Sequence, residues 1–182
     1  KFTKDTLKGK QSVADLQYFK IEKDIPKDGK VSDIVSSSSP ILVQVAKEPI
    51  SSKGPRLSAE ITLAGRYLVL VPFSEKVSIS KKIRDQKERE RLKELMEAIR
   101  PKNFGVIIRT VAEKKKVEQI DQDLKDLLNK WNTMYSNLKV AVPPKRVLGE
   151  MDKTTSILRD MLNGDFTNIH INNPDTLNEL KE

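Results

Sequence analysis

The sequence has no cysteine and only one histidine among its 182 residues. Disulfide bonds and thiolate metal sites are therefore excluded, and so is a metal site built from several histidines. The single histidine, His170, lies in an alternation of apolar and polar residues without a partner constellation. We interpret it as a surface or packing residue, and the sequence offers no Ser-His-Asp chemistry.

Long apolar runs are absent as well. No run approaches the ~20 residues that a membrane span needs, and the chain shows no signal-peptide pattern. We therefore expect a protein without membrane contact, in the cytoplasm. Because the chain opens on Lys1 and stops within a helical pattern at Glu182, we also expect a fragment of a longer protein.

Recognisable catalytic motifs are absent too: the chain has no paired-carboxylate motif, nucleophile elbow or phosphate-cradling glycine loop. Asp121, Asp123 and Asp126 lie close together in one predicted helix. Amphipathic helices usually carry such a polar outer face, so we interpret these three as solvated. We predict no catalytic residue in this chain.

Basic residues are in surplus, with 34 Lys and Arg against 26 Asp and Glu, a net charge of +8. This balance is consistent with a polyanionic partner. With 37% hydrophobic and 33% charged residues, the chain is polar but able to fold into one or two small domains.

Periodicity predicts an α+β protein. Apolar runs and period-two alternation predict strands, whereas apolar stripes at helical spacing predict helices. The predicted strands cover residues 41–46, 57–63, 67–71, 105–111 and 167–171. The predicted helices cover 85–99, 113–138 and 151–163, with a last helix opening at Pro174. The early strands and their basic loops suit the later part of a small oligonucleotide-binding barrel.

Residues 1–40 carry little strand pattern, and we expect much of this stretch to be poorly ordered. A short helix could be lined by Val13, Leu16, Phe19 and Ile21.

The pair Arg109–Thr110 ends an apolar strand just before a helix. Guanidinium and hydroxyl donors at that point could grip a phosphate. If strands 67–71 and 105–111 share a sheet, their ends could bring together Gly65, Val69, Lys81, Arg109 and Thr110. Arg109 could equally pair with a helix carboxylate such as Glu113, and the sequence leaves both readings open.

Two further basic spots are weaker signals. The loop 47–56 carries Lys47, Lys53 and Arg56, which could contact backbone phosphates or simply be solvated. Lys81 and Lys82 offer point charges suited to phosphate, although such a pair is usually ordinary surface.

Several of these segments together resemble the ribonuclease E/G family. The resemblance is collinear and strongest over residues 41–135. It is carried by Ile41-Leu-Val-Gln-Val-Ala-Lys-Glu-Pro-Ile50, Lys53-Gly-Pro-Arg-Leu57, Leu63-Ala-Gly-Arg-Tyr-Leu-Val-Leu-Val-Pro72, Ile79-Ser-Lys-Lys-Ile83 and Gly105-Val-Ile-Ile-Arg-Thr110. It is weaker through Leu158-Arg-Asp160 and Ile169-His-Ile-Asn-Asn-Pro174, and residues 1–40 match poorly.

The resemblance implies an architecture. Residues 1–59 would be the C-terminal part of an oligonucleotide-binding β-barrel with an insertion. Residues 60–154 would be a mixed α/β 5′-sensor region, and residues 155–182 would begin a ribonuclease-H-like segment. The family's catalytic subdomain, with its magnesium-binding aspartates, would follow, so this fragment would bind no metal and would be inactive alone.

The resemblance also implies a function: recognition of single-stranded RNA within a magnesium-dependent endoribonuclease of RNA processing and decay. The parent would be a homo-oligomer. Lys53 and Arg56 would contact the RNA backbone. The pocket for a 5′-monophosphate would comprise Gly65, Val69, Lys81, Arg109 and Thr110. Lys81 stands where the family commonly has arginine, which keeps the charge but loses bidentate geometry.

Two other functions compete with this reading. One is a standalone, noncatalytic RNA-binding module, and the other is an assembly segment whose basic surface is incidental.

Overall fold

The computed structural model describes residues 16, 17, 19, 28–33, 35–38, 40–149, 157, 158, 160–162 and 166–181. The chain divides into two compact units, residues 1–147 and 148–182. Among the described residues, no helix is long and apolar enough to cross a bilayer.

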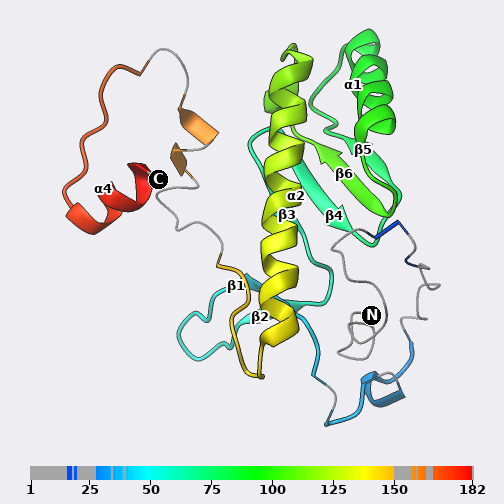
Figure 1. Cartoon of the computed structure of the whole chain (residues 1–182), viewed down its shortest axis with the longest axis vertical. Coiled ribbons are helices and arrows are strands. Elements are labelled where there is room, and N and C mark those ends of the chain that lie inside the picture. Colours follow the sequence, from blue (N-terminus) through cyan, green and yellow to red (C-terminus); the bar gives the residue numbers. More distant parts are fainter. Residues whose placement is uncertain are drawn as a thin grey trace. The chain divides into compact units, whose positions relative to one another are not determined.

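A four-stranded mixed sheet is the centre of the first unit (Figure 1). Its strands are β3 (Leu63–Ala64), β4 (Leu68–Pro72), β5 (Val77–Ile79) and β6 (Phe104–Ile108). The order is β3-β4-β6-β5, in which β5 and β6 are parallel and the other neighbours antiparallel. A parallel pair needs a crossover connection, and helix α1 (Gln86–Ile99) supplies it.

The core lies between one face of this sheet and two helices. Helix α2 (Val117–Val140) crosses β3 and β4, and α1 lies over β5 (Figure 1). Alternate strand residues point to this face, as a half-buried sheet requires. The residues with no exposed surface include Leu68, Leu70, Val106 and Ile108 on the strands and Leu92, Met96, Ile120 and Trp131 on the helices.

Both long helices agree with the periodicity, and their starts have local causes. Asp85 caps α1 by accepting hydrogen bonds from the backbone N–H groups of Lys87 and Glu88 at 2.9 and 3.4 Å. The predicted start of α2 at residue 113 is wrong. A 3₁₀ turn, η2 (Thr110–Ala112), comes first, and Lys114 has φ 58°, which no right-handed helix accommodates.

An aromatic cluster ties the N-terminal stretch to the core. The ring of Phe73 lies 4.9 Å from Phe19 and 5.6 Å from Trp131. The buried amide of Asn103 donates to the carbonyl oxygens of Leu16 and Phe19, both at 2.7 Å. Val13 and Ile21, which shared the predicted helix, lie outside the described residues.

The predicted strand 57–63 is in fact two short strands. Strand β2 (Arg56–Ser58) pairs with β1 (Gln44–Lys47), and β3 begins only at Leu63. The side chain of Ser58 accepts the N–H of Glu60 at 3.1 Å and bends the chain between them. Strand β1 itself starts three residues later than predicted.

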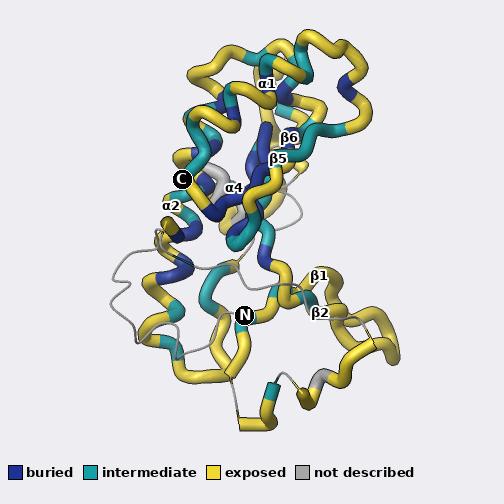
Figure 2. The backbone as a smooth tube through the Cα atoms, turned by 90° about the vertical axis from the view of Figure 1, so that its right-hand side faces the viewer, coloured by how far each residue is buried: buried dark blue, intermediate teal, exposed yellow. Residues whose placement is uncertain are grey.

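The β1–β2 hairpin is a separate two-stranded sheet and is almost wholly exposed (Figure 2). The described residues thus form an α+β fold with two sheets but no closed barrel. The assignment of this part to an oligonucleotide-binding barrel stays a prediction.

In the second unit, helix α4 (Pro174–Lys181) begins at the predicted proline. The predicted strand 167–171 is wrong, because residues 166–171 are irregular. Residues 166–170 are exposed, so their alternation has no buried face to support it. The predicted helix 151–163 lies mostly outside the described residues.

Candidate functional site

The ends of three strands meet at one edge of the four-stranded sheet. Ile108 at the end of β6 pairs with Leu68 at the start of β4 and with Ile79 at the end of β5. The pairing continues past the strands: Arg109 N–H donates to the Tyr67 carbonyl at 2.8 Å, and Ser80 N–H to the Ile108 carbonyl at 2.9 Å. We call this edge the strand-end site and define it as Gly65, Arg66, Ser80, Lys81, Arg109 and Thr110.

Arg109 is anchored at this edge by backbone carbonyls. Its Nη1 donates to the carbonyl oxygens of Gly65 at 2.6 Å and Arg66 at 3.2 Å. The side chain is half-buried. A guanidinium carries several N–H donors in a fixed plane, so two bonds through one nitrogen also set the direction of the rest of the group.

Thr110 follows on the same edge and is exposed. Its Oγ1 shares a hydrogen bond of 3.0 Å with Ser80 Oγ. Arg89 holds the turn after Ser80, since its Nη1 donates to the carbonyls of Ser80 and Ile83 at 2.9 and 3.0 Å. The structure therefore places two hydroxyl groups together, of which the sequence pointed to one.

Lys81 and Val69 lie on different elements next to the Arg109–Thr110 pair. Lys81 is exposed and directly follows Ser80. Val69 lies one pairing step into the sheet, opposite Ile107, which in turn faces Ser78. Val69 is half-buried and Ile107 is 41% exposed, so an open apolar strip adjoins the strand-end site.

The turn from Gly65 to Leu68 is fixed from α2. The Asp123 carboxylate accepts the backbone N–H groups of Arg66, Tyr67 and Leu68, each at 2.9 Å. The prediction that Asp123 belongs to a solvated face is therefore wrong. The prediction of a solvated side chain suits Asp121 better, because Asp121 pairs with exposed Lys125 at 2.6 Å.

A hollow of about 490 Å³ opens on the α2 side of this turn. Its lining residues are Arg66, Tyr67, Glu118, Gln119, Gln122, Asp123 and Asp126. Three of these are carboxylates, which repel an anion. The hollow is therefore unsuited to phosphate, in contrast to the strand-end site with its guanidinium, ammonium and hydroxyl groups.

The segment after Thr110 is held by the start of α1. Glu88 accepts the N–H of Lys114 at 2.8 Å and two hydrogen bonds from Arg91 at 2.8 and 2.7 Å. Arg91 also donates to the Lys115 carbonyl at 3.2 Å. The hydrogen bonds from Arg91 lower the pKa of Glu88, and Glu88 raises the pKa of Arg91.

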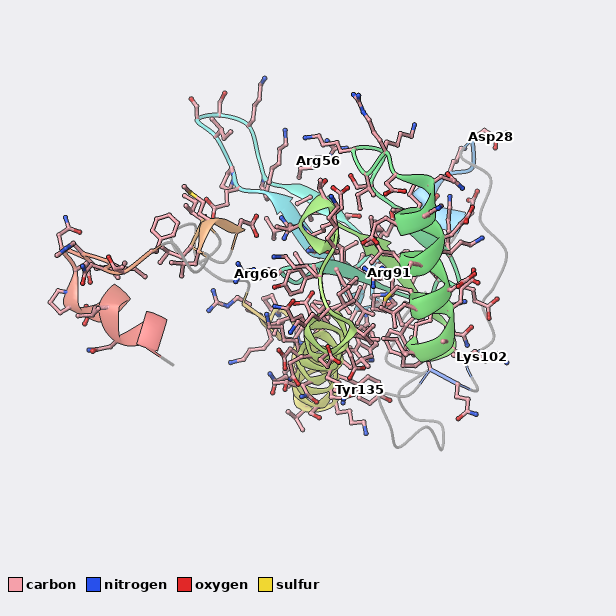
Figure 3. The ribbon with its side chains drawn as sticks, turned by 90° about the horizontal axis from the view of Figure 1, so that it is seen from above. Asp28, Arg56, Arg66, Arg91, Lys102 and Tyr135 are labelled. Carbon is pink, nitrogen blue, oxygen red and sulfur yellow. The ribbon has the colours of Figure 1, made fainter. Side chains whose placement is uncertain are left out.

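Lys53 and Arg56 belong to the other sheet. Both are exposed. Lys53 lies in the turn between β1 and β2, and Arg56 lies at the start of β2 (Figure 3). Arg66, by contrast, lies on the ribbon that leads into β4 (Figure 3). Gly65, Arg109 and Thr110 thus lie together at the strand-end site. Lys53 and Arg56, the predicted RNA-backbone contacts, lie on the separate β1–β2 hairpin.

A metal centre has no candidate in the described part of the chain. No group of three or more His, Asp or Glu side chains there could hold a metal ion. His170 is exposed in the irregular stretch before α4.

Comparison with known proteins shows which family this chain is similar to. A family model described as Ribonuclease E/G family matches residues 62–182. Ribonuclease E of Nostoc sp. is 35% identical over 152 residues, 84% of this chain and 22% of the relative. A ribonuclease E/G-like protein of Pyropia yezoensis is 38% identical over 150 residues, 82% of this chain and 30% of the relative.

Ribonuclease G of Haemophilus influenzae is 34% identical over 152 residues, 84% of this chain and 31% of the relative. The chain therefore spans between about a fifth and a third of the length of these curated relatives.

Proposed function

Because the chain belongs to the ribonuclease E/G family, we propose that it recognises single-stranded RNA and senses its 5′-monophosphate within a magnesium-dependent endoribonuclease. The observation that carries this proposal is the convergence of Gly65, Arg109 and Thr110 at one sheet edge. Arg109 and Thr110 hold the terminal phosphate, and Lys81 adds a positive charge from the same edge.

The chemistry of the strand-end site suits a small terminal anion. A 5′-monophosphate is a compact dianion, and charge-assisted hydrogen bonds from a planar guanidinium grip it in a defined direction. The Thr110 hydroxyl, held by Ser80 at 3.0 Å, adds a neutral donor. A triphosphate is bulkier, and we expect it to bind this donor set less tightly than a monophosphate.

The first nucleotide would rest beside the phosphate. Val69 and the exposed Ile107 offer an apolar strip one step into the sheet, against which a base or ribose can pack. Gly65 takes part through its backbone, because its carbonyl oxygen accepts a hydrogen bond from the Arg109 guanidinium at 2.6 Å.

Catalysis in this proposal belongs to other parts of the whole protein. Bound magnesium would polarise the scissile phosphate and lower the pKa of water, with ligands outside the described residues. Binding of the 5′ end would favour an RNA arrangement productive at that distant centre. Such a coupling between two sites is worth ~1–3 kcal/mol. This chain alone is expected to cleave no RNA.

Fluorescence anisotropy tests the proposal with one RNA sequence carrying a 5′-monophosphate, 5′-triphosphate or 5′-hydroxyl end. The monophosphate should bind at least about fivefold tighter than the hydroxyl. Arg109→Ala should abolish this preference and leave hydroxyl-ended RNA little changed. Arg84→Ala, which removes an exposed arginine from the turn before α1, serves as the matched control.

Equal binding of all three ends by the unaltered chain would contradict 5′ sensing. If that affinity also fell steeply with salt, the chain would be a general RNA-binding module instead.

A further inference from the structure

We infer that Asp123 is a positioning residue for the strand-end site. It fixes the turn of residues 65–68, whose carbonyl oxygens in turn hold the Arg109 side chain in one direction. This inference rests on the proposed function, because it assigns a role within the same 5′-phosphate site. Asp123 lies in α2, and its two carboxylate oxygens accept the three consecutive N–H groups of residues 66–68.

The clamp is geometrically tight at Gly65. A Cβ atom there would lie 2.6 and 2.7 Å from the two Asp123 carboxylate oxygens. Gly65 does not have a positive φ, so its backbone conformation alone does not demand glycine. The space beside Gly65 is instead filled by the carboxylate, which makes Gly65 and Asp123 a matched pair.

The turn transmits this constraint to Arg109. It is closed by the Gly65 N–H, which donates to the Leu68 carbonyl at 2.8 Å. Its other carbonyls face Arg109: those of Gly65 and Arg66 accept from the guanidinium, and that of Tyr67 from the Arg109 N–H. Asp123 thus holds the N–H groups of the turn, and Arg109 is held by its carbonyl groups.

Loss of the carboxylate should therefore change recognition. Three N–H groups in a largely buried turn would lose their charged acceptor, which is unfavourable unless the turn moves toward water. Movement of the Gly65 and Arg66 carbonyls would release the guanidinium from its fixed direction. The positive charge of Arg109 would remain, so general attraction to RNA should persist while selectivity for the 5′-phosphate falls.

The test compares Asp123→Asn with Asp126→Asn in the 182-residue chain. Both remove one negative charge from α2 and from the lining of the same hollow, but the described hydrogen bond of Asp126 is to the exposed Gln122 side chain at 2.9 Å. Asp123→Asn should lower the preference for monophosphate over hydroxyl ends by about tenfold and change hydroxyl-end affinity less than about twofold. Asp126→Asn should preserve the preference.

Gly65→Ala tests the contact between Gly65 and the Asp123 carboxylate by altering residue 65 instead of residue 123. It replaces the first test if Asp123→Asn protein does not fold. It should also lower the preference, and the Gly65→Ala/Asp123→Asn double variant should be no worse than the poorer single variant. Asp123→Glu, which keeps a carboxylate, should partly restore selectivity.

A preference retained in folded Asp123→Asn or Gly65→Ala protein would overturn the inference, as would an equal loss in Asp126→Asn. Failure of the proposed function itself would look different, because the unaltered chain would then show no preference for the monophosphate.

Discussion

Ser80 and Thr110 share a hydrogen bond of 3.0 Å between their hydroxyl groups across a separation of 30 residues. The contact exists because β5 runs parallel to β6 and both strands end at the same edge, where the Ser80 N–H donates to the Ile108 carbonyl. Thr110 is exposed, so its hydroxyl is restrained beside Ser80 and remains open to solvent.

The orientation of Thr110 leads to a graded prediction. Thr110→Ala should reduce monophosphate-ended RNA affinity by about tenfold through loss of a hydrogen bond to a charged group, whereas Thr110→Ser should retain most of it. Ser80→Ala should reduce it by about threefold, because the Thr110 hydroxyl is kept but less restrained. Anisotropy titrations measure all three, with Thr133→Ala on α2 as control. A Ser80→Ala effect larger than that of Thr110→Ala would contradict this order.

Lys81 and Lys82 are adjacent exposed lysines and provide a matched pair. Lys81 belongs to the strand-end site, so Lys81→Ala should lower the preference for a 5′-monophosphate by about fivefold. Lys82→Ala should weaken binding of all RNA ends equally. Lys81→Arg should raise the preference, since guanidinium binds phosphate in a bidentate manner. Equal effects of the two alanine variants on all RNA ends would show that Lys81 contributes only general charge.

The ion pair at the start of α1 predicts a pH dependence of stability. Hydrogen bonds from Arg91 lower the pKa of Glu88 from its ordinary value of 4.5, so the folded protein takes up this proton less readily than the unfolded chain. The resulting stabilisation is complete above pH 4.5 and is lost as the pH falls through the lowered pKa. Solvent around Arg91, which is 38% exposed, limits its size to about 1 kcal/mol.

Urea unfolding between neutral and acidic pH measures this contribution. Glu88→Gln should lower the free energy of unfolding at neutral pH by about 1 kcal/mol, and the difference from the unaltered protein should vanish in acid. Glu97→Gln is the control, because Glu97 is 52% exposed and lies 3.8 Å from Lys93. A constant difference at all pH values would refute the role of the Glu88 charge.

The sequence predicted the elements whose signals are local. The apolar stripes of α1 and α2 and the run of β4 mark these elements by periodicity alone, and the Arg109–Thr110 pair stands out at the end of its strand. Strand β5 escaped prediction because Val77–Ile79 carries only two apolar residues. It is a strand because its backbone pairs with β6, a contact that no local pattern encodes.

The role of Asp123 could not be predicted from the sequence for a related reason. Helical periodicity separates the apolar stripe of α2 from its polar residues, and Asp123 counts among the polar residues by that pattern. Its three acceptor bonds depend on which backbone N–H groups face α2 across more than fifty residues of chain. Gly65 carried the only local sign of this contact, since a glycine before a buried strand marks a close approach.

Asn103 attaches the N-terminal stretch around Leu16 and Phe19 to the core. It is 3% exposed, has φ 65°, and donates to the carbonyls of Leu16 and Phe19. Asn103→Gly keeps the left-handed backbone accessible but removes both bonds, so it should lower the free energy of unfolding by about 1–3 kcal/mol. Release of Phe19 from Phe73 should also change the fluorescence of Trp131, whose ring contacts Phe73.

Chemical unfolding followed by Trp131 fluorescence measures both effects in one experiment. Asn132→Gly, at an exposed position of α2 next to Trp131, controls for a glycine near the fluorophore. This control should cost only about 0.3 kcal/mol through helix propensity, since asparagine is itself a poor helix former, and it should leave the native emission spectrum unchanged. An unchanged native spectrum in Asn103→Gly would mean that the stretch around Phe19 stays packed through apolar contacts without the Asn103 amide.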